Sequence, residues 1–595
     1  MSMTSIMQRD LIGEYLVEED KENANKFESY TKLRGFVADS FIKKWALENI
    51  YTEDIANAHI EGFFHIHDLS DALVPYCKGH DATKILVKGL ITPTVVAAPP
   101  QHLSSFFDQL VNLICTAQQS WAGAQAIANL NTLGAPFVRK HSDSLRAKGL
   151  DEDTIKIMTY KYVKQTCQSF VYNLNFPSRA GSQTPFSNIT FNFACPANMR
   201  DEPVLNAGCE GTWGDYEEEA FLIIEAFNDV FMNGDTRNRP FTFPIVTINV
   251  IPETPFDHPL WLKLMETEVK FGTYSFFNYI GSGINPDTIL SMCCRLTIDL
   301  SELAPTGGRW AYAGETGSIG VVTLNMARLG YISGGISSKL LDELDKYLEL
   351  AKRSLLLKSH FINKHKDRFM PLDKIYGTDL SRFFRTIGVC GLNEMCVNMF
   401  GTPLSDNQEF VHDVLNHIRE WTRETQKETG VLWNLEMTPA EGTATRFAEI
   451  DYGMFGKDIF MQGNGIGKYY TSMITPPNQD MTIMERIAIE EKMLSMFTGG
   501  TVHRIYIGEH KPSPEAMGKL VEAIAKNTKI TYFDIASTFA VCSDCDGYQR
   551  GDNEACPDCG GEMVIWDRIV GYYRPRKQAN KGKVQEIHDR LWQTV

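Results

Sequence analysis

The chain has 595 residues and carries 58 Lys and Arg against 74 Asp and Glu, a formal net charge of −16. Apolar residues make up 43% of the sequence and charged residues 22%, which is typical of globular proteins and excludes wholesale disorder. The acidic balance argues against nucleic-acid binding, and no apolar run reaches the roughly 18–20 residues that cross a bilayer. Because the N-terminus also lacks a secretory signal, we expect a cytoplasmic protein with no membrane and no nucleic-acid partner.

Stretches typical of strands and of helices follow one another along most of the chain. Strand-like runs lie at 187–194, 241–251, 319–325 and 502–508. Helical periodicity marks 218–232, 337–359, 409–428 and 481–496. Ser513 followed by Pro514 predicts the start of a further helix, which reaches residue 527. This alternation predicts an α/β fold and favours a barrel.

The composition changes near residue 531. Beyond it, short segments rich in Gly and Cys lead to a basic stretch, RPRKQANKGK. We find no other boundary of this kind, so the sequence predicts one large part, residues 1–530, and a smaller C-terminal part, residues 531–595.

Four cysteines in the C-terminal part have the spacing of a metal site. They form two CxxC pairs separated by ten residues, Cys542 with Cys545 and Cys556 with Cys559. Each pair can present two thiolates to one tetrahedral Zn²⁺, and four thiolates close the coordination sphere, so the zinc is expected to be structural. Redox-active CxxC pairs are the alternative, but the ribbon spacing and the Gly-Gly that follows fit that interpretation poorly.

A glycine follows this cluster in the sequence Arg568-Ile-Val-Gly571-Tyr572. Taken alone, such a glycine is most simply part of a turn. Together with the cysteine cluster it resembles the glycyl-radical signature, in which a backbone glycine near the C-terminus stores an unpaired electron. A Cα radical is stabilised by donation from the amide nitrogen and withdrawal by the carbonyl group, which requires a planar centre that a Cβ would obstruct.

Seven short motifs occur in one order between residues 22 and 572. They are Glu22–Lys26, Glu61–Asp68, Ser182–Phe186, Met292–Arg295, Gly320–Asn325, Thr438–Glu441, and the four-cysteine cluster paired with Arg568–Tyr572. In this order they resemble the anaerobic (class III) ribonucleotide reductases, glycyl-radical enzymes that reduce ribonucleoside triphosphates to 2′-deoxyribonucleoside triphosphates. The resemblance implies a ten-stranded catalytic α/β barrel over 1–530 with a finger loop inside it near 285–297, and a zinc ribbon with the radical loop over 531–595.

The resemblance also implies roles for individual residues. Gly571 would hold the resting radical and pass it to Cys294, whose sulfur radical would remove the 3′-hydrogen of the ribose. Cys77 would deliver reducing equivalents on the opposite ribose face, although a lone buried cysteine is more often a small hydrophobic residue. Formate-using members have Gly at the position of Cys293 and Asn at the position of Ser318, so this chain is expected to use Cys293 and Cys77 with a thioredoxin- or glutaredoxin-like reductant.

Substrate contacts are expected at two motifs. Thr438 and Glu441 precede a helical segment whose N-terminus could bind a phosphate group, and Glu441 would lie near the ribose. His65 and His67 alternate on a strand and so share one face, as a metal pair would need. Without a third ligand, a structural role or a substrate contact is the favoured interpretation.

The resemblance further implies partners and effectors. None of the thirteen cysteines forms the CxxxCxxC motif of a radical S-adenosylmethionine enzyme, so a separate activase of that type must install the radical. A homodimer and dNTP or ATP effectors are family expectations, and no N-terminal ATP cone is expected because the family core begins near Glu22. The alternatives are another glycyl-radical enzyme, a pyruvate formate-lyase-like acyltransferase or a dehydratase, and a non-enzymatic zinc-ribbon scaffold.

Overall fold

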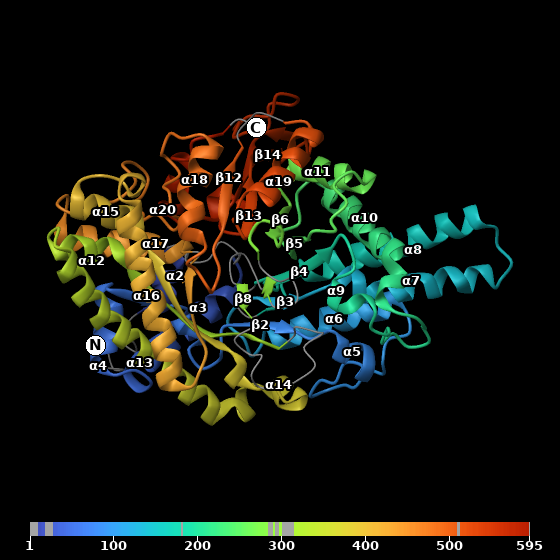
Figure 1. The fold of residues 1–595 in the computed structure, drawn as a ribbon, viewed down its shortest axis with the longest axis horizontal. Helices are drawn as coiled ribbons and strands as arrows, with labels where there is room; N and C mark the ends of the chain where they lie inside the picture. Colours follow the sequence, from blue (N-terminus) through green and yellow to red (C-terminus); the bar gives the residue numbers. More distant parts are fainter. Residues whose placement is uncertain are drawn as a thin grey trace.

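The computed structural model describes residues 10–17, 28–179, 183–283, 289–291, 297–299, 315–438, 440–507 and 512–593. Figure 1 shows strands gathered at the centre and helices around them, with the C-terminal part at one end. In the residues described, no helix is both long and apolar enough to span a membrane.

One half of the central sheet consists of five parallel strands from the first half of the chain. Their order in the sheet follows their order in the sequence. They are β2 (Cys77–His80), β3 (Gln125–Ile127), β4 (Ser187–Asn192), β5 (Ile245–Val250) and β6 (Tyr274–Asn278).

Five later strands form the other half. They are β9 (Gly317–Asn325), β10 (Phe384–Cys390), β11 (Trp433–Met437), β12 (His503–Tyr506) and β13 (Tyr532–Ala536). The halves meet in antiparallel pairs, β2 with β9 and β6 with β13. A parallel bridge between Glu436 and Gly500 joins β11 to the segment before β12, with a hydrogen bond of 3.0 Å from the Met437 amide to the Gly500 carbonyl. Ten strands therefore close a ring, which confirms the predicted α/β barrel, and β1 (Phe64–Ile66) adds to β9 outside it.

Helices connect the strands and cover the barrel. The main ones are α2 (Leu11–Val17), α3 (Tyr30–Asn49), α4 (Glu53–Glu61), α5 (Thr83–Lys88), α6 (Leu103–Ala117), α7 (Leu130–Arg146), α8 (Glu152–Leu174), α10 (Glu217–Asn233), α11 (Pro259–Phe271), α12 (Met326–Ser333), α13 (Ser337–Phe369), α14 (Pro371–Tyr376), α15 (Leu392–Phe400), α16 (Gln408–Thr429), α17 (Glu441–Phe455), α18 (Ile483–Leu494), α19 (Pro514–Asn527) and α20 (Lys581–His588). The predicted helices correspond to α10, α13, α16, α18 and α19. The Ser513 hydroxyl caps α19 by accepting from the Ala516 amide at 3.1 Å.

The two faces of the barrel strands differ in polarity. On β5, Val246 and Ile248 belong to the large apolar core, which also includes residues of the surrounding helices. On the other face of β5, Thr247 lies 3.5 Å from the Tyr532 hydroxyl of β13. Because residues alternate between faces along a strand, the helices receive the apolar face and the barrel interior receives a polar one.

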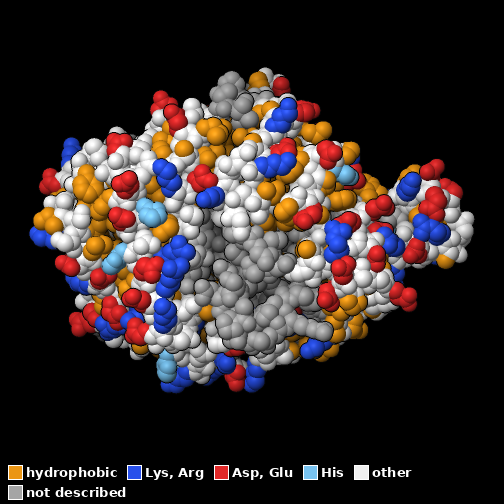
Figure 2. Space-filling model, in the orientation of Figure 1, with side chains coloured by type: hydrophobic (Ala, Val, Ile, Leu, Met, Phe, Trp, Pro, Cys, Tyr) orange, Lys and Arg blue, Asp and Glu red, His pale blue; other side chains and the backbone are white. Residues whose placement is uncertain are grey.

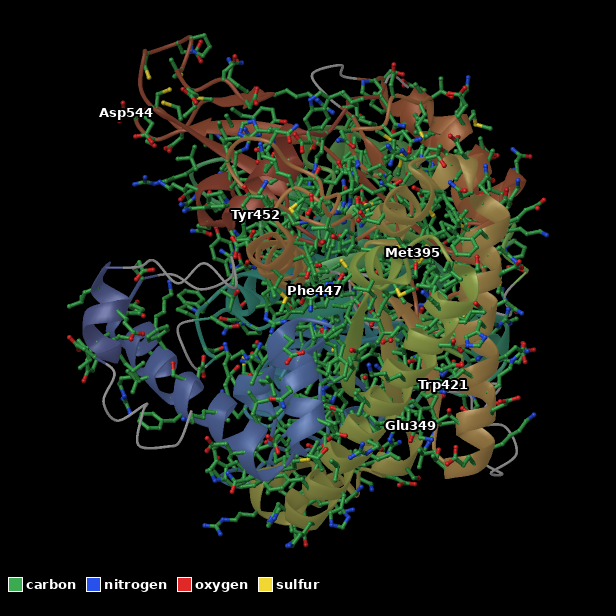
Figure 3. All side chains as sticks on the ribbon, turned by 90° about the vertical axis from the view of Figure 1, so that its left-hand side faces the viewer. Glu349, Met395, Trp421, Phe447, Tyr452 and Asp544 are labelled. Carbon is green, nitrogen blue, oxygen red and sulfur yellow. The ribbon has the colours of Figure 1, made fainter. Side chains whose placement is uncertain are left out.

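The C-terminal part forms a separate four-stranded sheet in the order β15-β14-β16-β17. Its strands are β14 (Thr538–Cys542), β15 (Tyr548–Arg550), β16 (Met563–Arg568) and β17 (Tyr573–Pro575). The composition changes at residue 531, whereas β13 still belongs to the barrel and this second sheet begins at Thr538. Asp544 lies at the outer edge of the molecule in Figure 3, so the sheet extends outward from the barrel.

The predicted finger loop lies between β6 and β9. Two short strands, β7 (Ile289–Ser291) and β8 (Thr297–Asp299), pair in antiparallel fashion there. Residues 292–296 between them, including Cys293 and Cys294, lie outside the described residues. On the face drawn in Figure 2, acidic and basic side chains are interspersed among the described residues.

Candidate active site and metal centre

Gly571 lies in the tight turn that joins β16 to β17. Arg568 and Tyr573 are the last paired residues of the two strands, and the Ile569 amide donates to the Tyr572 carbonyl at 2.9 Å. This leaves Val570 and Gly571 as the two residues of the turn. Gly571 is buried, as a residue that stores a radical must be.

Aromatic and polar contacts hold this turn against the barrel. The Tyr572 ring packs on Phe186 and Phe243, with ring centroids 5.6 and 5.5 Å apart. Phe186 ends the predicted Ser182–Phe186 motif, and Thr184 of that motif accepts from the Arg574 guanidinium at 3.3 Å. Residues 184–186 of the motif therefore lie beside the turn, directly before β4.

Tyr572 also connects the turn to the predicted substrate segment. Its hydroxyl donates to Glu441 Oε2 at 3.1 Å, and the Asn580 side chain donates to the Glu441 carbonyl at 3.0 Å. Glu441 is the first residue of α17, three residues after Thr438. Residues 441 and 571, which are 130 positions apart in the sequence, thus lie in one region.

A second hydrogen-bonded chain reaches Thr438 from the histidine motif. His67 Nε2 lies 2.8 Å from the Thr323 hydroxyl, which in turn donates to the Thr438 hydroxyl at 2.8 Å. Gly388 of β10 lies between them, where a Cβ would come within 1.9 Å of the Thr438 hydroxyl, so glycine is required for this approach. Thr438 and His67 are therefore brought together, as the expected site needs.

The two predicted histidines are neighbours, with ring centroids 4.8 Å apart. Burial, together with nearby positive groups, holds the pKa of His67 at about 3 and that of His65 well below its usual range, so both rings are neutral at neutral pH. His65 Nδ1 lies 3.4 Å from the Arg446 guanidinium of α17, and the Arg446 side chain also donates to the His59 carbonyl. Among the residues that the structure describes, no cluster of three or more metal-binding side chains includes His65 or His67.

Cys77 is buried on β2 and faces Ser318 of β9 in the sheet register. Its Sγ would lie 2.7 Å from a Cβ added at Gly123. Burial lowers the pKa of the Lys358 ammonium, against the opposing influence of Asp68 and Asp71. Cys293 and Cys294 fall outside the described residues, so the pairing of these sulfurs stays a prediction.

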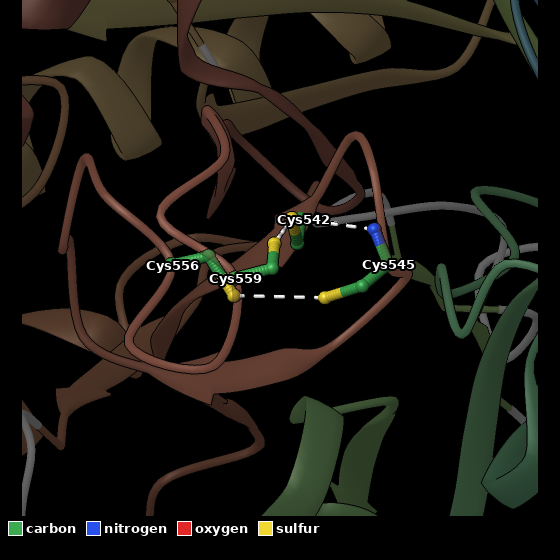
Figure 4. A group of neighbouring side chains, drawn as sticks. All are labelled: Cys542, Cys545, Cys556 and Cys559. Atoms are coloured by element: carbon green, nitrogen blue, oxygen red, sulfur yellow. Dashed lines mark hydrogen bonds between the residues drawn. The ribbon is translucent and has the colours of Figure 1, made fainter.

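The four C-terminal cysteines converge on one point (Figure 4). Their ligand atoms all lie within 4.8 Å of one another, with Cys542 and Cys559 sulfurs 3.5 Å apart and Cys545 and Cys556 sulfurs 3.6 Å apart. Four sulfurs about 2.3 Å from a tetrahedral Zn²⁺ would be separated by about 3.8 Å. The Cys545 and Asp544 amides point at Cys542 Sγ and hold the pKa of this thiol at about 7, while the pKa of Cys545 and that of Cys559 are raised. The cluster fits a structural zinc ion.

Several residues of this region carry no local sequence signal. Arg504 and Asp534 form a buried ion pair on neighbouring strands, and the Arg504 side chain donates to the Val570 carbonyl. Thr323 and Arg446 likewise contact predicted site residues from distant elements. Arg504 lies within the strand-like run at 502–508, but nothing in the sequence predicted its partner.

The barrel of two antiparallel halves and the glycine turn docked against it define an α/β-barrel enzyme of the glycyl-radical class. Residues 22–592 match the family model described as "Anaerobic ribonucleoside-triphosphate reductase". The chain belongs to this family and is an oxidoreductase, as the motifs indicated.

Known proteins agree with this assignment. The anaerobic ribonucleoside-triphosphate reductase of Escherichia coli (strain K12) is 23% identical over 621 residues, covering 96% of this chain and 83% of the relative. The anaerobic ribonucleotide reductase of Thermotoga maritima, solved in complex with dATP and CTP, superposes with a TM-score of 0.75 at 23% identity and covers 97% of this chain and 94% of its own. A hydroxyproline dehydratase from Clostridioides difficile shares the fold at a lower TM-score of 0.53 and 11% identity, covering 97% of this chain and 88% of its own, so the dehydratase alternative is not favoured.

Proposed function

We propose that this chain reduces ribonucleoside triphosphates by storing a radical on Gly571 and transferring it to Cys294. The observation that carries the proposal is the hydrogen bond from Tyr572, which adjoins Gly571, to Glu441 of the substrate segment. A stored radical is useful only if its glycine lies next to the place where substrate is held. The buried turn beside Thr438–Glu441 meets this requirement.

The reaction begins when the Cys294 sulfur radical takes the 3′-hydrogen and forms an S–H bond. This transfer is nearly thermoneutral because the two bonds are similar in strength. The 2′-hydroxyl then takes a proton and leaves as water. We assign the handling of protons at the ribose to Glu441. Return of the 3′-hydrogen from Cys294 regenerates the sulfur radical.

Two reducing equivalents enter from a thiol pair. Cys77 and Cys293 give up two hydrogens and become a disulfide, so each deoxynucleotide formed consumes one dithiol and releases one water. A thioredoxin- or glutaredoxin-like dithiol protein then reduces the disulfide by exchange. This assignment is tested by assaying turnover with formate alone and with a thioredoxin system alone; robust activity with formate only would refute it.

The substrate contacts combine neutral and charged groups. His65 and His67, being neutral, suit hydrogen bonds to hydroxyl groups, whereas Arg446 beside His65 is a cation suited to phosphate. Thr438 extends this polar row toward Glu441. The Thermotoga maritima relative was solved with CTP and dATP, and we assign a ribonucleoside triphosphate substrate and dNTP or ATP effectors to this chain by that analogy.

The proposed reaction requires partner proteins for installing the radical and for specificity control. A radical S-adenosylmethionine activase must reach Gly571, and a homodimer would carry the specificity control. The zinc ribbon supports β16 and β17, and so supports the turn while it is exposed to the activase. Zinc held by Cys542, Cys545, Cys556 and Cys559 would supply structural cross-linking and no reaction step.

The decisive experiment is anaerobic activation with the activase, S-adenosylmethionine and a reductant, followed by electron paramagnetic resonance. We expect a doublet from the single Cα hydrogen of Gly571, followed by dNTP formation when nucleotide and dithiol are added. Absence of a doublet would contradict the radical assignment. A doublet without nucleotide reduction would favour another glycyl-radical enzyme.

A further inference from the structure

A buried group of charged side chains lies directly behind the Gly571 turn. Arg504 of β12 faces Asp534 of β13 in the sheet register and binds it through two parallel hydrogen bonds of 2.7 Å, from Nε to Oδ1 and from Nη2 to Oδ2. The same Nη2 donates to the Val570 carbonyl oxygen. Arg568 of β16 completes the group, with its Nε 3.4 Å from Asp534 Oδ2.

A second guanidinium holds the strand just before the turn. Arg590 Nη2 donates to the Arg568 carbonyl at 3.0 Å and lies 3.2 Å from the Glu586 carboxylate of α20. The Arg504 and Arg590 side chains are both almost completely buried. Two cations thus bind the carbonyls of residues 568 and 570, on either side of Ile569.

The Val570 carbonyl has a special relation to Gly571. It belongs to the peptide group whose nitrogen is the Gly571 nitrogen. A radical on the Gly571 Cα draws electron density from this nitrogen. A charged donor on the carbonyl oxygen draws the same electron density toward the carbonyl, and it fixes the plane of the peptide group.

We propose that Arg504, assisted by Arg590, is a positioning residue that fixes the Val570–Gly571 peptide and sets the distribution of the unpaired electron on Gly571. The inference rests on the proposed radical function. Arg504 contacts the backbone of the turn, at the Val570 carbonyl. It therefore acts through Gly571 and touches no reacting atom of the substrate.

The alternative role is a purely structural ion pair. Burial alone would lower the pKa of Arg504, but the charge and hydrogen bonds of Asp534 raise it above its usual value, so Arg504 remains charged. A buried pair is weak support for stability by itself, since apolar residues often replace such pairs at no loss. Besides its two hydrogen bonds to Asp534, Arg504 donates to the Val570 carbonyl. A purely structural ion pair would not require this additional contact.

The test compares Arg504→Lys with Arg486→Lys in the full chain. Lysine keeps the charge and loses the planar fork that serves Asp534 and Val570 together. Arg486 is an equally buried guanidinium on α18, which donates to Thr475 and to the Pro476 carbonyl rather than to the turn. Hydrogen exchange at the Ile569 amide, which is bonded to the Tyr572 carbonyl, reports whether the turn is held.

We expect R504K to accelerate exchange at Ile569 about tenfold or more, since a charge-assisted hydrogen bond is lost, and R486K to leave it unchanged. After activation, R504K should give a narrower doublet, because the nitrogen then takes a larger share of the spin. It should also give a lower radical yield, because the plane of the Val570–Gly571 peptide is no longer fixed. Wild-type exchange together with a wild-type doublet in R504K, or equal changes in R486K, would overturn the inference.

Two further outcomes are informative. If R504K does not fold, Arg590→Lys removes the neighbouring carbonyl contact and is expected to accelerate the same exchange; no acceleration would count against the inference. If the wild-type chain gives no doublet, the proposed function fails, while the exchange measurement still decides whether Arg504 holds the turn.

Discussion

The two ends of strand β16 lie in opposite environments. At the outer end, Met563 pairs with Cys542, and two of the four cysteines, Cys545 and Cys559, are exposed. At the inner end, the Arg568 side chain is only 1% exposed and the turn with Gly571 is buried. Six residues of one strand thus lead from a surface metal centre to the radical turn.

The two ends are also held by different parts of the chain. The cysteines of the outer end all come from residues 542–559, within the sheet that they stabilise. The inner end is held by the barrel, through Glu441 of α17, Arg504 of β12 and Phe186 before β4. We infer that the ribbon can keep its shape when the turn leaves the barrel, because the four cysteines that would hold the zinc all lie within residues 542–559.

The largest effect should come from Gly571→Ala at the inner end. A Cβ obstructs the planar Cα radical, so we expect activity at background and no doublet, with zinc content unchanged. Turnover near the wild-type rate would contradict the assignment. Gly453→Ala on α17 is the matched control, since a Cβ there meets no atom within 4 Å and full activity is expected.

Cys77→Ala should separate radical storage from reduction. We expect a normal doublet from Gly571 and a loss of turnover of at least about a thousandfold, as is usual for a residue that takes part in the reaction. The measurement is dNTP formed per radical. Cys167→Ala, at another fully buried cysteine, should keep most of the activity. Equal losses in the two variants would indicate a packing role for Cys77.

At the outer end, Cys542→Ser or removal of zinc by a chelator should have a smaller effect. We expect a several-fold lower radical yield, because the end of β14 and the loop before β16 lose their cross-link. We expect a thermal midpoint within a few degrees of the wild type, because the barrel is untouched. Zinc content and the doublet are measured together. Cys115→Ser, outside the cluster, is the control. Unchanged radical yield in a zinc-free protein would remove the supporting role of the ribbon.

The same contrast explains what the sequence could predict. The four cysteines and the cap of α19 depend on residues within a few positions of each other, so their geometry follows from spacing. Element ends also follow from local chemistry: β5 begins at Ile245 instead of 241 because Pro244 has no amide hydrogen for the ladder, and α18 begins after Thr482, whose hydroxyl accepts from the Glu485 amide.

The inner end could not be predicted in this way. Tyr572 and Glu441 are 131 residues apart, Thr323 and Thr438 are 115 apart, and Arg504 meets Val570 only after the ring of strands has closed. The order of the motifs predicted that the segments carrying Glu441, Thr438 and Tyr572 share one site. Which of their atoms form hydrogen bonds is determined by the closed barrel. The prediction for Cys293 and Cys294 stays open, since they lie outside the described residues.

Removing one hydrogen bond near each end of β16 tests whether the inner end, at the Gly571 turn, matters more for turnover than the outer end, at the cysteine cluster. Tyr572→Phe deletes the bond to Glu441, and we expect turnover per radical to fall about three- to tenfold, the usual worth of one such bond. Tyr548→Phe deletes a bond of 2.6 Å to the Lys270 carbonyl near the ribbon and should leave turnover unchanged. Equal effects of the two substitutions would mean that the Tyr572 hydroxyl has no particular role in the site.

The smallest effect concerns pH and the inner end alone. Burial raises the pKa of Glu268 on α11 to about 8, against the opposing influence of Arg568 and of the Tyr274 amide, which donates to it at 2.7 Å. A carboxyl group whose pKa is raised by folding stabilises the fold fully below its unfolded pKa, near 4.5, and this contribution is lost as pH rises through about 8. Glu268→Gln stays neutral, so the difference in urea midpoint between wild type and E268Q should move in favour of E268Q between pH 5 and pH 8. A difference that stays constant over this range would show that Glu268 is already ionised beside Arg568, and the inner end would then hold one more buried charge than we infer.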